Sequence, residues 1–282
     1  MATQTQLTNV DGFTIIDIEG VARLVGPVRL ARKVLPRTTI DLVRHATYAC
    51  AIHKLDAVGA AAALNHDRPN ADPSAIETFA GELTTWAEAN NFVANATLGL
   101  DADEVNMGSE GLEESMDEAM AASASSCLGP SADKLVIVSA KDEPALTSAL
   151  GDRSPTTEPD LAVALSSGAD AVFVRAKTGT LDHAVLEDIN VGAIIGLQPL
   201  TTTARGLAFA GRAGTVIVPD FISAAGATLA ALGHEPGEIA SMTSDVMAPL
   251  HDAGIDMFVT ASETAESHLS TLSPTLPFGR AL

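Results

Sequence analysis

The stretch 191-VGAIIGLQPLTTTARGLAFAGRAGTVIVPD-220 predicts a strand, a helix and a second strand, in that order. Residues 191–196 and 215–218 are short, continuous apolar runs, which is the composition of strands buried on both faces of a sheet. Residues 203–211 between them form a helical stretch. Because strands that alternate with helices are typical of parallel sheets, this segment indicates a βαβ unit.

The alternation continues toward the N-terminus of this segment. Apolar runs at residues 134–139 and 171–175 predict two more strands, and residues 160–166 and 181–188 predict helices. Four strands of this kind indicate a small, doubly wound, Rossmann-like sheet whose first crossover is shorter than usual. We assign it to residues 108–282, where a helical stretch at 110–126 comes before it and helices follow at the C-terminus.

The first 107 residues predict a separate α/β domain of the substrate-binding or dimerisation type, since 282 residues suffice for two domains. Residues 13–35 suit strands joined by turns. A helix is expected after Pro36, with Thr38 and Asp41 in a capping box and one face at positions 40, 43, 47 and 50. Residues 57–64 are mostly small, and residues 72–90 predict an amphipathic helix.

The composition limits the partners that this protein can have. Acidic residues outnumber basic ones 36 to 16, and the net charge of −20 argues against nucleic acid and acidic membrane surfaces. Such a surface resembles that of proteins from salt-accumulating microbes, where a Debye length of about 3 Å at molar salt screens self-repulsion. Two cysteines, no signal peptide and no apolar run long enough for a membrane span lead us to expect a cytoplasmic protein.

Taken without any known family, the sequence contains few motifs that indicate catalysis or ligand binding. Phosphate-loop, nucleophile-elbow and zinc-protease motifs are absent from the sequence. Cys50 and His53 lie three apart on one expected helix, but no further ligand has suitable spacing, so we expect no metal site. Asp220 follows a buried strand, where ligands of open α/β sheets bind; a turn with Asp220 as helix N-cap is the structural alternative.

A resemblance to a known family enters at residues 215–226, TVIVPDFISAAG. This segment resembles the strand, PD turn and NAGG helix of the glutamate/leucine/phenylalanine/valine dehydrogenases, the amino-acid dehydrogenase family. Four further segments fall in the family's order and approximate spacing: Gly196 with Thr201 and Thr202, Gly26-Pro27, Thr47-Tyr48, and residues 92–99. The resemblance covers most of the chain, from about Gly26 to Thr228, and indicates a shortened and degenerate member.

The resemblance implies a chemistry whose residues are missing from this chain. The family oxidises an amino acid with NAD(P)+, and it uses two lysines and an aspartate to hold the substrate carboxylate and move protons. The matching positions hold Ala49, Ala61 and Thr97. No lysine occurs between Leu55 and Asp133, so a small shift of the alignment cannot restore the second one.

The supporting positions have changed in the same way. The two asparagines of the family's GAN and NAGG segments are Gln198 and Ala224 here, and its substrate-loop diglycine is Leu30-Ala31. The glycine-rich turn that would hold a pyrophosphate reads SAKDEPA at residues 139–145. Because Asp142 and Glu143 would face a diphosphate of the same sign, we expect no cofactor, and NAD(P) only if the protein is an active enzyme.

Three hypotheses remain from the sequence. The leading one is a protein of the dehydrogenase fold that has lost oxidative deamination and acts in binding, regulation or assembly, as a homo-oligomer or with a true dehydrogenase. The alternative is an active oxidoreductase with relocated groups, for which the candidates are Lys33, His53, Lys54, Thr201 and Asp220. Both lysines fit an exposed surface equally well. A third hypothesis is a sensor whose cleft binds a small ligand without phosphate.

Overall fold

The computed structural model of the protein describes residues 2–67, 73–100, 102–105 and 112–276. These residues fold into two compact units. Of the described residues, the first unit takes those up to Glu114, Ala227–Gly233 and 265–276, and the second takes Ser115–Gly226 and His234–Thr264. The boundary expected between residues 107 and 108 lies outside the described residues, so it stays a prediction.

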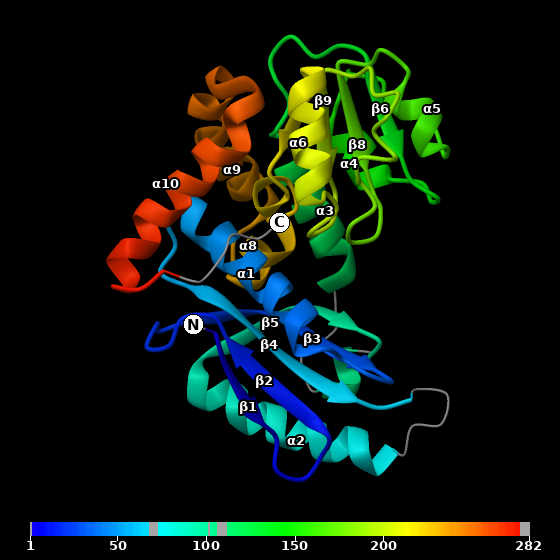
Figure 1. Ribbon diagram of the computed structural model, residues 1–282. Helices are drawn as coiled ribbons and strands as arrows, with labels where there is room; N and C mark the ends of the chain where they lie inside the picture. The colour runs from blue at the N-terminus through cyan, green and yellow to red at the C-terminus, as the bar shows by residue number, and fades with distance from the viewer. Residues whose placement is uncertain (1, 68–72, 101, 106–111, 277–282) are drawn as a thin grey trace. The chain divides into compact units, whose positions relative to one another are not determined.

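The first unit is built on a five-stranded mixed sheet. Its strands are β1 (Thr3–Gln6), β2 (Gly12–Ile16), β3 (Leu24–Ala31), β4 (Val58–Asn65) and β5 (Phe92–Leu98), in the order β1-β2-β4-β3-β5. Strands β3, β4 and β5 are parallel, whereas β2 pairs antiparallel with both β1 and β4. Helices α1 (Pro36–Ile52) and α2 (Pro73–Asn90) lie on opposite sides of this sheet (Figure 1). The short helix η2 (Ala102–Val105) follows β5.

Helix α1 confirms the expected helix but not its expected cap. Pro36 occupies the first turn, where its missing N–H costs nothing, and Leu35 is the N-cap without a side-chain cap bond. The hydroxyls of Thr38 and Thr39 both donate to the Leu35 carbonyl, at 3.0 and 3.1 Å. The predicted capping box of Thr38 and Asp41 is therefore wrong, because the helix begins at Pro36, two residues before Thr38.

Segments from far along the chain complete the first unit. Helices α8 (Gly226–Ala231) and α10 (Met257–Leu272) contribute residues to it. The Tyr48 hydroxyl, on a side chain only 1% exposed, donates to Glu266 Oε1 at 2.8 Å. Asn95 Nδ2 donates to Thr228 Oγ1 at 2.9 Å. The hydrogen bonds that hold this unit together thus span up to 218 residues of sequence.

The second unit contains the expected parallel sheet, with one strand more than expected. Strands β6 (Leu135–Val138), β7 (Thr156–Thr157), β8 (Ala171–Val174), β9 (Ala193–Gly196) and β10 (Val216–Val218) lie in the order β10-β9-β8-β6-β7, and every pair is parallel. The two-residue edge strand β7 is too short and too polar for its sequence to predict. The chain passes from β6 outward to β7 and returns on the other side at β8, as in a doubly wound fold.

Helices precede, connect and follow these strands. They are α3 (Leu112–Ser125), α4 (Pro144–Ala149), α5 (Leu161–Leu165), α6 (Ala204–Ala213), α7 (Asp220–Ser223), α9 (Pro236–Leu250) and the short helix η3 (His251–Asp256). The first crossover is short, as expected, because α4 has six residues. Asp160 caps α5 by accepting the N–H groups of Ala162 and Val163. No helix of the described residues is long and apolar enough to cross a membrane.

The helix expected at residues 181–188 is wrong, because this segment forms a series of turns. Leu181 makes a parallel bridge with Thr202 and donates its N–H to the Thr201 carbonyl. The Asp182 carboxylate accepts the Thr203 hydroxyl at 3.2 Å. Leu181 and Leu186 are both fully buried, so their spacing reflects burial in the core of this unit rather than a helical face.

Candidate functional site

The most distinctive polar site of the second unit lies between β6 and β8. These neighbouring strands are the point where the strand order reverses, because the chain leaves β6 for one side of the sheet and returns to the other. Ligands of open α/β sheets bind outside the carboxyl ends of the strands at such a switch point. Ser139 follows β6 directly, and Arg175 follows β8 directly.

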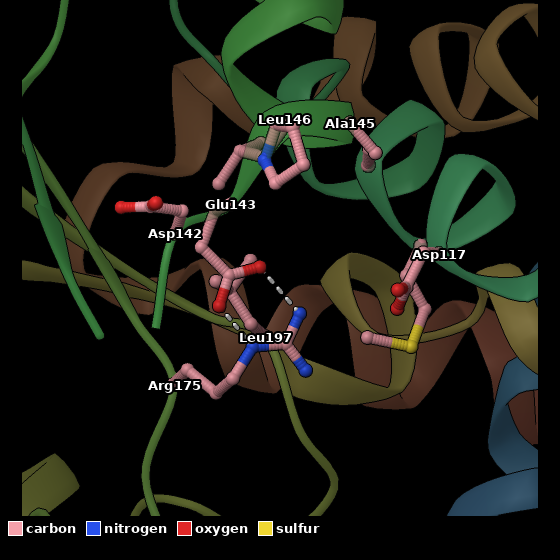
Figure 2. Close-up of a pocket in the computed structure, with 10 residues that line it drawn as sticks. Asp117, Asp142, Glu143, Ala145, Leu146, Arg175 and Leu197 are labelled. Carbon is pink, nitrogen blue, oxygen red and sulfur yellow. Dashed lines mark hydrogen bonds and ion pairs between the residues drawn. The ribbon is translucent and has the colours of Figure 1, made fainter. Parts of the chain in front are cut away.

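An ion pair occupies this position (Figure 2). Arg175 donates through both Nε and Nη2 to the two oxygens of the Glu143 carboxylate, the second bond measuring 2.8 Å. The Ser139 hydroxyl donates to Glu143 Oε1 at 2.7 Å, and the Lys141 N–H donates to Ser139 Oγ at 3.2 Å. The turn after β6 is therefore closed on itself by its own glutamate, which receives three side-chain hydrogen bonds.

A small cavity borders the ion pair. It has a volume of about 50 Å³ and is lined by Asp117, Met120, Ala121, Asp142, Glu143, Pro144, Ala145, Leu146, Arg175 and Leu197. Leu146 and Leu197 are almost fully buried, so one wall is apolar. The cavity has room for a few water molecules, whereas ligand pockets usually measure about 300–1,000 Å³.

These residues do not fit a dinucleotide. The Glu143 carboxylate takes the donors that a phosphate would use, and the adjoining cavity is far too small for a nucleotide. The sequence predicted exclusion by like charge from Asp142 and Glu143. In the structure the charge of Glu143 is paired with Arg175, and Asp142 is exposed and points away from the ion pair (Figure 2). The absence of a bound dinucleotide in this protein stays a prediction.

Thr201 and Asp220 are brought together at the ends of β9 and β10. The Thr201 N–H donates to Asp220 Oδ2 at 3.1 Å, and the Thr201 hydroxyl donates to the Gln198 carbonyl at 2.8 Å. Ala224 donates its N–H to the Asp220 carbonyl at 2.8 Å. The N-cap of α7 is Pro219 without a side-chain cap bond. Asp220 thus anchors the loop after β9 rather than capping its own helix.

The three positions matched to the family's catalytic residues lie in the first unit. Ala49 in α1 and Ala61 in β4 are both 0% exposed, and Thr97 in β5 is partly exposed. The side chain of Ala61 lies in an apolar cluster with Phe13 and Ile15, among others. A lysine at position 61 would therefore be enclosed by apolar groups, which disfavour its charged form.

Lys33, His53 and Lys54 do not form one cluster. Lys33 is exposed beyond the carboxyl end of β3, whereas His53 and Lys54 follow α1, next to the amino end of β4. Since β3 and β4 are parallel, the length of α1, about 25 Å for its 17 residues, separates the two groups. His53 is buried with Nδ1 2.8 Å from the Ala49 carbonyl, and Lys54 is exposed in a left-handed conformation at φ 58°.

The sequence analysis missed two charged residues that the structure places in polar sites. Arg175 was read only as the last residue of a strand, although a cation at the carboxyl end of a buried strand is itself a signal. Asp17 is 1% exposed, and Arg44 Nη2 lies 3.4 Å from its Oδ1. Burial raises the pKa of Asp17, and the neighbouring Thr47 hydroxyl and Arg44 guanidinium partly offset this effect.

Reactive cysteine and metal chemistry have little support in the part of the chain that the structure describes. Both cysteines are buried; burial raises the pKa of Cys50 to about 12 and also raises that of Cys127. Within the described ranges, no three His, Cys, Asp or Glu residues are grouped so that they could hold a metal ion.

Comparison with solved structures identifies the architecture. A hetero-hexameric glutamate dehydrogenase from Thermus thermophilus, in a Leu-bound form, matches at a TM-score of 0.73 and 16% identity, over 97% of this chain and 89% of its own. L-tryptophan dehydrogenase from Nostoc punctiforme matches at a TM-score of 0.72 and 13% identity, over 96% of each chain. Glutamate dehydrogenase from Peptoniphilus asaccharolyticus matches at 0.69 and 11% identity, over 98% and 92%. The chain has the amino-acid dehydrogenase fold.

This fold is retained at very low sequence identity. No family model matches the sequence, and no curated protein matches it. The resemblance drawn from residues 215–226 is confirmed at the level of the fold, and so is the expected combination of an N-terminal α/β unit with a reduced Rossmann-like unit. The amino-acid dehydrogenase fold places the Glu143–Arg175 pair at the switch point of its parallel sheet.

Proposed function

We propose that this protein is a non-catalytic protein of the amino-acid dehydrogenase fold, which acts by binding or assembly rather than by oxidative deamination. The single observation that carries this proposal is the ion pair of Glu143 and Arg175 at the switch point of the parallel sheet, where doubly wound sheets that bind dinucleotides hold the diphosphate. Without a dinucleotide there is no hydride acceptor for the family's reaction.

The first unit supports the same proposal. The positions matched to the two lysines and the aspartate are Ala49, Ala61 and Thr97, and none of these side chains can hold a carboxylate by charge or move a proton. Within each unit the relocated candidates give no substitute for the lost groups, because Lys33 is distant from Lys54 in the first and Asp220 binds the Thr201 backbone in the second. Both halves of the family's chemistry are thus disfavoured independently.

An assay of turnover tests this proposal. NAD- and NADP-linked oxidation of Glu, Leu, Val and Phe is measured in high salt, with an active glutamate dehydrogenase in the same buffer as positive control. We expect no rate above background. Turnover by the wild-type protein would refute the proposal and favour an active oxidoreductase with relocated groups. Lys54→Ala and Asp220→Asn would then show which of these side chains the activity needs.

The proposed assembly role has a separate measurement. Strands β1 and β5 are the two edges of the first sheet, and Leu98 at the end of β5 is 43% exposed. We expect self-association through this unit, as a homo-oligomer in molar salt by light scattering after size exclusion. A monomer at all concentrations would favour association with a true dehydrogenase instead, which co-purification of the two proteins would test.

A further inference from the structure

We propose that the crevice between β6 and β8 is a carboxylate-binding site, in which Arg175 is the receptor and Glu143 is the resident carboxylate. A small free carboxylic acid, in its ionised form, competes with Glu143 for Arg175. This inference rests on the proposed loss of dinucleotide binding at the same place. It adds what the site binds instead.

The geometry of Arg175 is that of a receptor. Its Nε and Nη2 both donate to one carboxylate, which is the paired arrangement that a planar carboxylate fits best. Ser139 supplies a third donor, to the same Glu143 oxygen that Arg175 Nε contacts. Arg175 is held by the end of the buried strand β8, and its side chain is 27% exposed. A ligand can therefore reach it from solvent.

Glu143 can leave this position without unfolding its own helix. It is the N-cap residue of α4, but its side chain makes no cap hydrogen bond, and Pro144 sets the start of that helix. The helix bond from the Thr147 N–H goes to the backbone carbonyl of Glu143, at 2.9 Å. The carboxylate of Glu143 thus accepts hydrogen bonds from Arg175 and Ser139, whereas only its backbone takes part in the hydrogen bonding of α4.

The space around the pair limits the size of the ligand. The cavity of about 50 Å³ and the volume released by the Glu143 side chain together accommodate an acid of a few carbons. Leu146 and Leu197, which are 2% and 3% exposed, offer an apolar wall for a short aliphatic tail. A nucleotide needs several times more room than the cavity provides.

The surrounding charge favours a monocarboxylate over a phosphate compound. Asp117 and Asp142 line the same cavity, and both are exposed. Their repulsion of an anion grows in proportion to the anion's charge, so it penalises pyrophosphate several times more than a carboxylate of charge −1. A short carboxylic acid is therefore the class of ligand that matches the size, the donors and the charge together.

Binding of propionate to three variants tests the proposal, at one fixed molar concentration of KCl and with calorimetry as the readout. Glu143→Ala removes the resident carboxylate, and we expect it to bind propionate at least tenfold more tightly than wild type. Asp142→Ala is the matched control, because it removes one negative charge from the same turn without freeing Arg175; we expect only the small gain that weaker repulsion gives, well below tenfold. The double variant Glu143→Ala/Arg175→Ala should lose the gain.

A second substitution protects the test against a folding defect. Glu143→Gln keeps the side-chain volume, so we expect an affinity between those of wild type and Glu143→Ala, with far-UV circular dichroism unchanged. Equal affinity in wild type and both Glu143 variants, or a gain that survives removal of Arg175, would overturn the proposal. Tighter binding of pyrophosphate than of propionate by Glu143→Ala would overturn the assignment to carboxylates. The proposed function fails on a different result, turnover of an amino acid by the wild-type protein.

Discussion

Returning a lysine to position 61 is the sharpest test of the account given for the first unit. Ala61 is 0% exposed, and its neighbours Phe13, Ile15 and Val43 are at most 2% exposed. A lysine enclosed in this cluster has its pKa lowered by three units or more from about 10.4. At pH 7 such a shift lowers the free energy of unfolding by about 4–5 kcal/mol, since each unit counts about 1.4 kcal/mol.

Steric strain must be separated from charge. Ala61→Met introduces a side chain of similar length without a charge, and overpacking of this kind costs about 1–3 kcal/mol. We therefore expect Ala61→Lys to be less stable than Ala61→Met by about 4–5 kcal/mol at pH 7. Urea unfolding at fixed salt measures both variants. Thr97→Lys, at a partly exposed position of the edge strand β5, is the surface control, with an expected loss below about 1 kcal/mol.

The pH dependence has a defined sign. Because the folded pKa of the lysine lies below its unfolded value, the penalty is largest at low pH and disappears as the pH rises toward about 10.4. Between the folded pKa of the lysine and about pH 10.4, the difference in free energy of unfolding between Ala61→Lys and Ala61→Met should narrow by about 1.4 kcal/mol per pH unit. Equal stability of the two variants at pH 7 would refute the reasoning, because it would mean that the ammonium group reaches water.

The remaining predictions concern stability and follow from single positions or, in the last case, from the net charge. Gly26→Ala should destabilise the protein by more than about 3 kcal/mol in urea unfolding, because the new Cβ would lie 1.8 Å from the Ala60 carbonyl oxygen. As its control, Gly81→Ala in α2 should stabilise the protein by about 0.5–1 kcal/mol, because its new Cβ meets no atom within 4 Å. The backbone N–H groups of Lys134 and Asp133 hold the pKa of Asp170 below its ordinary value of 3.8. Asp170→Ala should thus lower the unfolding midpoint at pH 7, and this difference from wild type should shrink as the pH falls through the folded pKa. A difference that stays constant with pH would argue against a role for these hydrogen bonds. Asp160→Ala removes the cap of α5 and should cost about 1 kcal/mol, whereas an unchanged midpoint would mean that the cap contributes nothing. With a net charge of −20, the melting temperature should rise steadily between 0.1 and 1 M KCl as the Debye length falls from about 10 to about 3 Å, and a flat profile would contradict a role for self-repulsion.

The sequence predicted the elements whose burial is regular. Strands β6, β8, β9 and β10 are continuous apolar runs, and α1 and α2 carry apolar residues at helical spacing. It failed where local and tertiary signals conflict. Residues 181–188 have apolar residues at helical spacing, at Leu181, Ala184 and Val185, but the segment forms turns and Leu181 bridges to Thr202. Strand β7 is a strand only because it pairs with β6, and the local sequence of β7 does not predict that pairing.

The candidate site was predictable only in part. The sequence alone shows that positions 49, 61 and 97 carry no charged side chain. Thr201 and Asp220, both candidates from the sequence, do lie in contact. The pairing of Glu143 with Arg175 could not be read in this way, because 32 residues and two strands separate them. The sequence shows which side chains follow each strand, and the order of strands decides which of them meet.

The joining of Tyr48 to Glu266 has a consequence for how the protein is made. A ribosome releases the first unit's sheet-forming residues long before residues 265–276 emerge. The first unit therefore stays incompletely covered during synthesis until Glu266 and its neighbours have been added. Removal of residues 265–276 would thus destabilise a unit whose sheet is formed by residues 3–98.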